Sequence, residues 1–174
     1  MKDDDYMEDF ICKIANLDEM NIKWDYEIEH NKDEEQNWVT WKKDNIERFK
    51  NGSIIPYYGI LNGKIITEGT ALIDPNVLKD ISDLIDDKTA YLMAFRTIDE
   101  YQGKGYFSKL FKYIVQDLKS KGYKRLTIGV EPTEIKNKTI YFNYGFTNFV
   151  RASQEKYPDG SIIDVEYYYK ELED

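Results

Sequence analysis

The stretch between residues 89 and 130 places the strongest single constraint on the fold. Residues 89–98 form an apolar run that predicts a strand buried on both faces. A glycine-bearing turn follows, and residues 105–121 then carry apolar side chains at helical spacing before Gly122. Residues 126–130 predict a second buried strand. A strand, a helix and a strand in this order pack as a right-handed parallel crossover, so the sheet contains a parallel pair.

A tight turn elsewhere in the chain requires antiparallel pairing. Two β-rich runs, residues 54–61 and 64–73, are separated only by Asn62-Gly63. This dipeptide is a strong hairpin signal, because a type I′ turn needs positive φ at both central residues. The sheet is therefore expected to be mixed.

The remaining elements are expected from weaker patterns. Trp38, Trp41, Ile46 and Phe49 predict a helix that ends at Asn51-Gly52. Residues 17–30 have apolar points in an acidic background and stay unassigned, while residues 31–37 form either a surface connection or the first turn of the following helix. Further strands are expected at residues 10–15, 149–154 and 162–169, with short helices at 77–85 and 134–144. The whole predicts a single α+β domain, residues 1–174, with a mixed, mostly antiparallel central sheet flanked by helices.

Composition narrows the class of protein and its compartment. A chain that is 41% hydrophobic can fill a core, and its net charge of −9 argues against nonspecific binding to nucleic acid or anionic membranes. Cys12 is the only cysteine, which excludes an intramolecular disulfide and a zinc site built on paired thiolates. The acidic first residues and the lack of an apolar run of about 20 residues predict a cytoplasmic protein without a membrane span.

Chemistry concentrates in the turn Gln102-Gly103-Lys104-Gly105. Glycines let a backbone approach a ligand closely, and the N-terminus of the following helix favours a phosphate or pyrophosphate. A tight strand-to-helix connection without a ligand is the alternative. A Walker loop is excluded because Lys104 is followed by glycine. A dinucleotide fingerprint lacks its third glycine at Ser108, but Glu131 at the end of the next strand leaves a dinucleotide-binding oxidoreductase as a remaining alternative.

Two segments resemble the GNAT family of N-acetyltransferases. The run AFRTIDEYQGKGYFSKL, residues 94–110, is similar to the family's acetyl-CoA-binding segment, which has Gln or Arg, two residues, Gly, one residue, then Gly or Ala. Gln102 and Gly105 match, whereas Phe107 replaces the last small residue and is expected to pack in the core. The run EPTEIKNKTIYFNYGF, residues 131–146, resembles the family's later strand-to-helix region. Tyr141 falls where the family has a general acid toward the CoA thiolate.

The resemblance implies a GNAT-like acyl-CoA N-acyltransferase fold, with a cofactor-binding core at about 54–170 and an acceptor-side region at about 1–52. It implies acetyl-CoA as co-substrate and direct attack by a primary amine of a small molecule or peptide, with Tyr141 as the catalytic acid. A non-catalytic acyl-CoA sensor is the alternative, and a homodimer is left open. The implied cofactor-binding residues are Phe95, Arg96, Thr97, Gln102, Gly103, Lys104, Gly105, Tyr106, Phe107, Ser108 and Asn137.

The general base and the acceptor site stay open. Glu68, Glu131, Glu134 and water chained to them are candidate bases, and none is singled out by spacing. His30 is expected to be a solvated surface histidine, and Cys12 a small core residue. The resemblance places the following residues near the acceptor, although simple packing of the tryptophans is the stronger interpretation: Trp24, Tyr26, Trp38, Trp41 and residues 154–161.

Overall fold

The computed structural model describes residues 9–173. Its strands form one seven-stranded sheet in the order β1-β2-β3-β4-β5-β7-β6. The strands are β1 (Phe10–Ile14), β2 (Ile54–Leu61), β3 (Lys64–Leu72), β4 (Thr89–Thr97), β5 (Arg125–Val130), β6 (Asn148–Lys156) and β7 (Ile162–Glu171). Only β4 and β5 pair in parallel, as the crossover requires; the other neighbours are antiparallel. The expected mixed, mostly antiparallel sheet is confirmed.

Helices cover both faces of this sheet. They are α1 (Leu17–His30), α2 (Glu35–Lys50), α3 (Tyr106–Ser120) and α4 (Ile135–Asn143), with short 3-10 turns η2 (Lys32–Glu34), η3 (Lys79–Leu84) and η4 (Asp99–Tyr101). No helix within residues 9–173 is both long and apolar enough to cross a bilayer.

The strongest sequence patterns appear where they were expected. Asn62 and Gly63 have φ values of 49° and 83°, the positive values that a type I′ turn needs between β2 and β3. The helix expected at 105–121 is α3, and its buried stripe includes Leu110, Ile114 and Leu118. Turn chemistry and helical periodicity were therefore sufficient for these two elements.

The unassigned region 17–30 is the helix α1. Asn16 and Glu19 form a capping box at its start, in which each side chain binds the other residue's backbone N–H. Its buried face includes Lys23 and Glu27, and these charged residues interrupt the apolar periodicity that would have revealed the helix. Residues 31–37 contain both of the expected structures: a surface turn, η2, comes first, and the first turn of α2 follows it.

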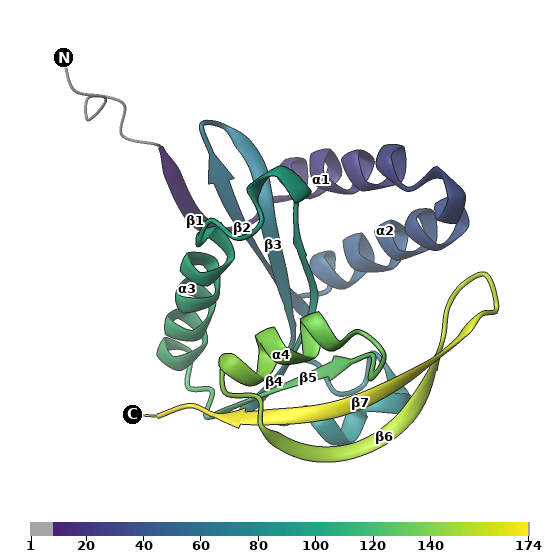
Figure 1. The fold of residues 1–174 in the computed structure, drawn as a ribbon, viewed down its shortest axis with the longest axis vertical. Coiled ribbons are helices and arrows are strands. Elements are labelled where there is room, and N and C mark those ends of the chain that lie inside the picture. The colour runs from purple at the N-terminus through teal and green to yellow at the C-terminus, as the bar shows by residue number, and fades with distance from the viewer. Residues whose placement is uncertain (1–8, 174) are drawn as a thin grey trace.

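Each face of the sheet has its own pair of helices (Figure 1). On the α1–α2 face, Trp24 and Trp38 pack with Tyr58 and Leu72 of the sheet. The α3–α4 face carries a second apolar cluster, whose buried members include these residues: Tyr57, Leu92, Leu110, Ile114, Leu118, Leu126, Ile128 and Phe146.

The parallel pair β4–β5 opens toward one end. Its register runs from Thr89 opposite Arg125 to Leu92 opposite Ile128 and stops there. Strand β4 continues to Thr97, still paired with β3 on its other side. The two parallel strands thus leave one edge of β4, residues 93–97, without a strand partner.

Candidate active site

The glycine turn connects β4 to α3. Gly103 and Gly105 have φ values of 72° and 88°, and a Cβ added at either would meet nothing within 4 Å. Glycine is needed there for backbone conformation and not for packing. No side chain caps α3, and the first N–H groups of a helix have no acceptor within it. The Gln102 amide donates to the carbonyl of Thr97 at 3.0 Å and to Asp99 Oδ1 at 3.2 Å, which fixes the shape of the turn.

A β-bulge deforms the open part of β4. Arg96 pairs with Glu68 and Met93 with Thr70, so Ala94 and Phe95 together lie opposite Gly69. Ala94 has a φ of 58°, in the left-handed region that alanine seldom occupies, and such strain is a feature of functional sites. A Cβ at Gly69 would lie 2.6 Å from the Phe95 ring, so the bulge also explains this glycine.

A cavity of about 910 Å³ lies at this open end of the sheet. Of the cofactor-binding and catalytic residues that the resemblance implied, Lys104 is not among the lining residues, and the others are brought together in the cavity wall. The lining comprises residues 95–103 and 105–108, with Lys136, Asn137, Ile140, Tyr141 and Tyr144 of the α4 region, and Tyr26, Glu27, His30, Asn31 and Trp38 of the α1–α2 region.

Tyr141 reaches the cavity from α4. Its ring centroid lies 5.7 Å from that of Phe95, and no described residue accepts a hydrogen bond from its hydroxyl. Burial, together with the charge of Glu134, raises the pKa of Tyr141 to about 12. The phenol therefore keeps its proton at neutral pH. Asn137, one turn earlier, donates its side-chain amide to Glu134.

Phe107 packs as its place on the helical stripe suggests. Its ring lies 5.2 Å from Phe95 and 5.6 Å from Tyr144, at the edge of the apolar cluster on the α3–α4 face. The ring thus forms part of the cavity wall while its other contacts are in the core.

His30 is exposed, as expected, but it also lines the cavity, which sequence reasoning did not anticipate. Its ring stacks on Tyr26 with centroids 3.9 Å apart, and Nδ1 lies 2.7 Å from the Tyr26 carbonyl oxygen. A carbonyl only accepts, so Nδ1 carries the proton and Nε2 of the neutral ring is left as a proton acceptor. The signal in the sequence was the Tyr26–His30 spacing of four residues on one helix.

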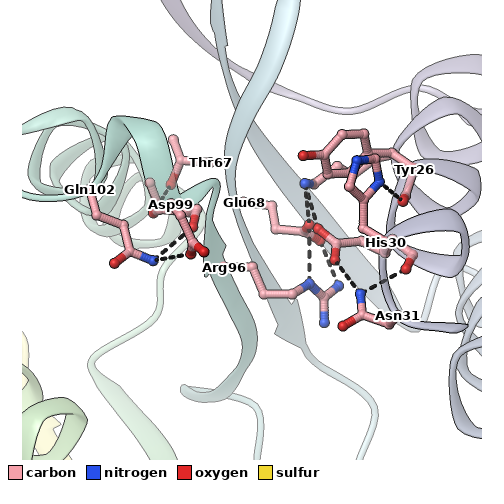
Figure 2. A network of polar contacts seen from close by, with 11 residues as sticks. Tyr26, His30, Asn31, Thr67, Glu68, Arg96, Asp99 and Gln102 are labelled. Carbon is pink, nitrogen blue, oxygen red and sulfur yellow. Dashed lines mark hydrogen bonds and ion pairs between the residues drawn. The ribbon is translucent and has the colours of Figure 1, made fainter. Parts of the chain in front are cut away.

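Buried charges join α1 to the sheet beside the cavity (Figure 2). Lys23 Nζ lies 2.7 Å from Glu27 Oε1 and 3.6 Å from Glu68 Oε2. Arg96 donates to both oxygens of Glu68, from Nε at 3.2 Å and from Nη2 at 2.8 Å. Burial opposes the charge of Arg96, but the Glu68 carboxylate outweighs this effect and raises the pKa of the guanidinium. Asn31 extends the network by donating to Glu27 Oε2 at 3.2 Å.

The tryptophans of the first two helices have different positions. The guanidinium carbon of Arg96 lies 4.9 Å from the rings of both Trp24 and Trp38. Trp41 packs edge-on against Trp38 and Tyr157, at 5.3 Å and 5.1 Å between centroids. Trp38 lines the cavity, whereas Trp24 and Trp41 are not among its lining residues. Packing accounts for Trp24 and Trp41, and Trp38 has a place in the site.

The β6–β7 turn is tied to α2 next to the site. Asn37, almost fully buried, donates to Asp159 Oδ2 at 3.1 Å and accepts from the Asp159 backbone N–H at 2.9 Å. Gln36 donates to the Pro158 carbonyl at 3.3 Å. These bonds join segments 122 residues apart and close this side of the α1–α2 face.

The carboxylates considered as bases are not free in the cavity. Both oxygens of Glu68 are held by Arg96. Glu131 and Glu134 are not among the lining residues. Glu131 accepts from the Tyr157 hydroxyl at 3.3 Å, and burial, with the charge of Glu134, raises its pKa.

Comparison with known proteins bears on this arrangement. The family model of the acetyltransferase (GNAT) family matches residues 9–146. No curated protein matches the chain by sequence.

Solved structures share the fold at low sequence identity. A probable acetyltransferase of Staphylococcus epidermidis is 14% identical with a TM-score of 0.71, covering 94% of this chain and 99% of that one. The ribosomal-protein-S18-alanine N-acetyltransferase of Escherichia coli is 14% identical with a TM-score of 0.66, covering 95% of both chains. A GNAT family acetyltransferase of Elizabethkingia anophelis with acetyl-CoA bound is 19% identical with a TM-score of 0.56, covering 75% of this chain and 83% of that one.

Proposed function

The chain belongs to the GNAT family of acetyltransferases, and from this premise we propose that it transfers the acetyl group of acetyl-CoA to a primary amine of a small molecule or peptide. One observation carries the proposal: a single cavity joins the glycine turn, the unpaired edge of β4, Tyr141 and His30. These are the parts needed to hold a phosphorylated acyl carrier and to move protons beside its thioester.

The residues present fit acetyl-CoA. The open backbone at Gly103 and Gly105 and the uncapped N-terminus of α3 suit the pyrophosphate. Backbone groups of β4 between residues 93 and 97 lack a partner in β5 and suit the amides of the pantetheine arm. When bound, acetyl-CoA supplies the activated thioester.

Tyr141 acts as the acid toward the departing sulfur. A pKa of about 12 leaves its phenol protonated, with the hydroxyl free to donate. The left-handed bulge at Ala94 suits polarisation of the acetyl carbonyl by backbone N–H groups. Direct attack within a ternary complex needs no acyl-enzyme, because the cavity holds both reactants together.

His30 takes the proton that the amine loses. It lines the cavity with Nε2 as its acceptor nitrogen, whereas Glu68 is occupied by Arg96. Proton transfer occurs directly or through one water, as general base catalysis allows.

Calorimetric titration with acetyl-CoA, followed by CoA-thiol release with a panel of primary amines, tests the proposal. We expect binding and turnover in the wild type. Tyr141→Phe should lower kcat roughly 100-fold with little change in acetyl-CoA affinity, because general acid catalysis contributes at least that factor. Tyr123→Phe, a half-buried tyrosine outside the cavity, is the matched control.

The other possible results of this experiment lead to different conclusions. An unchanged rate in Tyr141→Phe excludes this residue as the acid. Absence of acetyl-CoA binding overturns the proposed function. Tight binding without turnover on any amine favours the acyl-CoA sensor instead.

A further inference from the structure

We propose that the acceptor end of the cavity contains a carboxylate-binding subsite built on Arg96, so that the acetylated amine belongs to a compact amino acid. The inference rests on the proposed transferase function and names its substrate class. It is carried by the geometry of Arg96 and by an unpaired donor on Trp38.

Arg96 presents only one part of its guanidinium to a ligand. Two of its nitrogens, Nε and Nη2, donate to Glu68, and the rings of Trp24 and Trp38 each lie 4.9 Å from its central carbon. Figure 2 shows the third nitrogen pointing away from Glu68. The side chain is 22% exposed and lines the cavity. The exposed end is therefore a fixed donor, and planar carboxylates are the preferred partners of such a donor.

Trp38 supplies a second donor in the same wall. Trp38 is 9% exposed. Among the buried side-chain nitrogens and oxygens of residues 9–173, its indole Nε1 stands alone in having no hydrogen-bond partner. A buried N–H without an acceptor is costly, and such groups are rare in native proteins. The guanidinium carbon of Arg96 lies 4.9 Å from the same ring, so in this proposal a ligand oxygen bound at Arg96 also accepts from the Trp38 N–H.

The charge of this wall selects a zwitterion over a dianion. Lys23 and Arg96 balance Glu27 and Glu68, so the ion network is neutral before a ligand binds. An amino acid enters with its ammonium and carboxylate and adds no net charge. A phosphate monoester would add negative charge beside two buried carboxylates, which is unfavourable at low dielectric.

The position of Arg96 limits the length of the acceptor. Arg96 lies two residues after Ala94, so the proposed carboxylate site and the bulge at which the acetyl carbonyl is expected belong to one short segment of β4. We therefore expect an acceptor whose amine and carboxylate are separated by a few bonds.

The kinetic test compares α-amino acids with the corresponding amino acid amides, which lack only the negative charge. In the wild type we expect kcat/KM to be roughly 10- to 100-fold higher for the acids, the range of a hydrogen bond to a charged group. Arg96→Gln should lower turnover of the acids much more than that of the amides and so bring this ratio close to one, and Arg96→Lys should restore part of it. Arg151→Gln is the matched control, because Arg151 is also held by a carboxylate (Asp83) and an aromatic ring (Tyr167) but does not line the cavity.

Two results overturn the subsite. In one, the wild type acetylates amides as well as acids, which leaves the transferase function intact. In the other, Arg96→Gln lowers turnover of acids and amides by the same factor, as expected if Arg96 only neutralises Glu68.

A binding measurement covers the case in which no member of the panel is acetylated. The indole ¹⁵N–H signal of Trp38, assigned by its loss in Trp38→Phe, is followed in the acetyl-CoA-bound protein. Addition of the amino acids should move this signal, and addition of the amides should not. A signal that moves with none of them overturns the subsite, while acetyl-CoA binding in the same samples reports separately on the proposed function.

Discussion

The two faces of the sheet are stabilised in different ways. On the α3–α4 face, helix α3 contributes an uninterrupted apolar stripe, and the buried residues of its cluster are hydrophobic. On the α1–α2 face, Lys23, Glu27 and Glu68 are buried beside tryptophans, and Arg96 is held among them. The first arrangement depends on burial of apolar area. The second depends on ion pairs that must all be complete, because an unpaired charge in the interior is strongly destabilising.

This contrast follows the proposed division of labour. In the proposed function the α3–α4 side binds the cofactor through backbone groups and a helix N-terminus, which tolerate an ordinary hydrophobic core behind them. In the same proposal the α1–α2 side recognises a polar acceptor, for which fixed side-chain donors are needed. The buried charges of Lys23, Glu27 and Glu68 thus lie on the side to which the proposal assigns acceptor recognition.

Of the substitutions that test this difference between the two faces, removal of Glu68 should have the largest effect on the free energy of unfolding. Glu68→Ala leaves Arg96 without its carboxylate, and we expect a loss of about 3–5 kcal/mol in the free energy of unfolding. Urea denaturation measures it. Glu171→Ala, which removes an exposed pair with Arg125, should cost less than about 1 kcal/mol.

A double variant sharpens the interpretation. Glu68→Leu combined with Arg96→Met should recover most of the lost stability, because Lys23 keeps Glu27 as its partner. Equal losses for the single and double variants would show that shape, and not charge, governs this face.

Asn37→Ala should have an intermediate effect that is confined to the acceptor side. Two hydrogen bonds to Asp159 are lost, so we expect a decrease of about 1–2 kcal/mol in unfolding free energy. KM for the acceptor should rise about three- to tenfold while the Kd for acetyl-CoA stays the same. Gln36→Ala, which removes one exposed bond, is the control. Equal changes in both constants would mean that the two sides are coupled.

Glu131 is half-buried and follows directly after β5. Its substitution should have the smallest effect on the free energy of unfolding. Burial raises the pKa of its carboxyl above the ordinary value of 4.5, so the folded protein holds this proton more tightly than the unfolded chain. Its contribution to stability is therefore present below the ordinary value and is lost as pH rises through the raised one. Glu131→Gln should be slightly more stable than the wild type at pH 7, and the difference should shrink at about pH 4. A difference that does not depend on pH, measured by thermal unfolding, would contradict this account.

Short-range signals predicted much of the cofactor side. Asn62-Gly63 defined a hairpin, and the stripe of α3 defined a helix to within one residue at each end. The capping box of Asn16 and Glu19 was also readable, but α1 stayed unassigned because Lys23 and Glu27 lie on its buried face. Contacts such as Arg96–Glu68, 28 residues apart, and Asn37–Asp159, 122 apart, have no local pattern. These long-range contacts therefore emerged only from the folded chain, although the family resemblance had placed Tyr26 and Trp38 near an acceptor.

The extra residue at Ala94 also decides which face of the sheet each later side chain of β4 points to. In a regular strand, residues two apart share a face, yet Met93 packs with the cluster of the α1–α2 face and Phe95 with that of the α3–α4 face. The bulge reverses the alternation from this point onward. Without it, Phe95 would turn toward α1 and α2, and Arg96 would turn into the apolar core beneath α3. A single inserted position thus decides which of two chemically different compartments receives the only arginine of this strand.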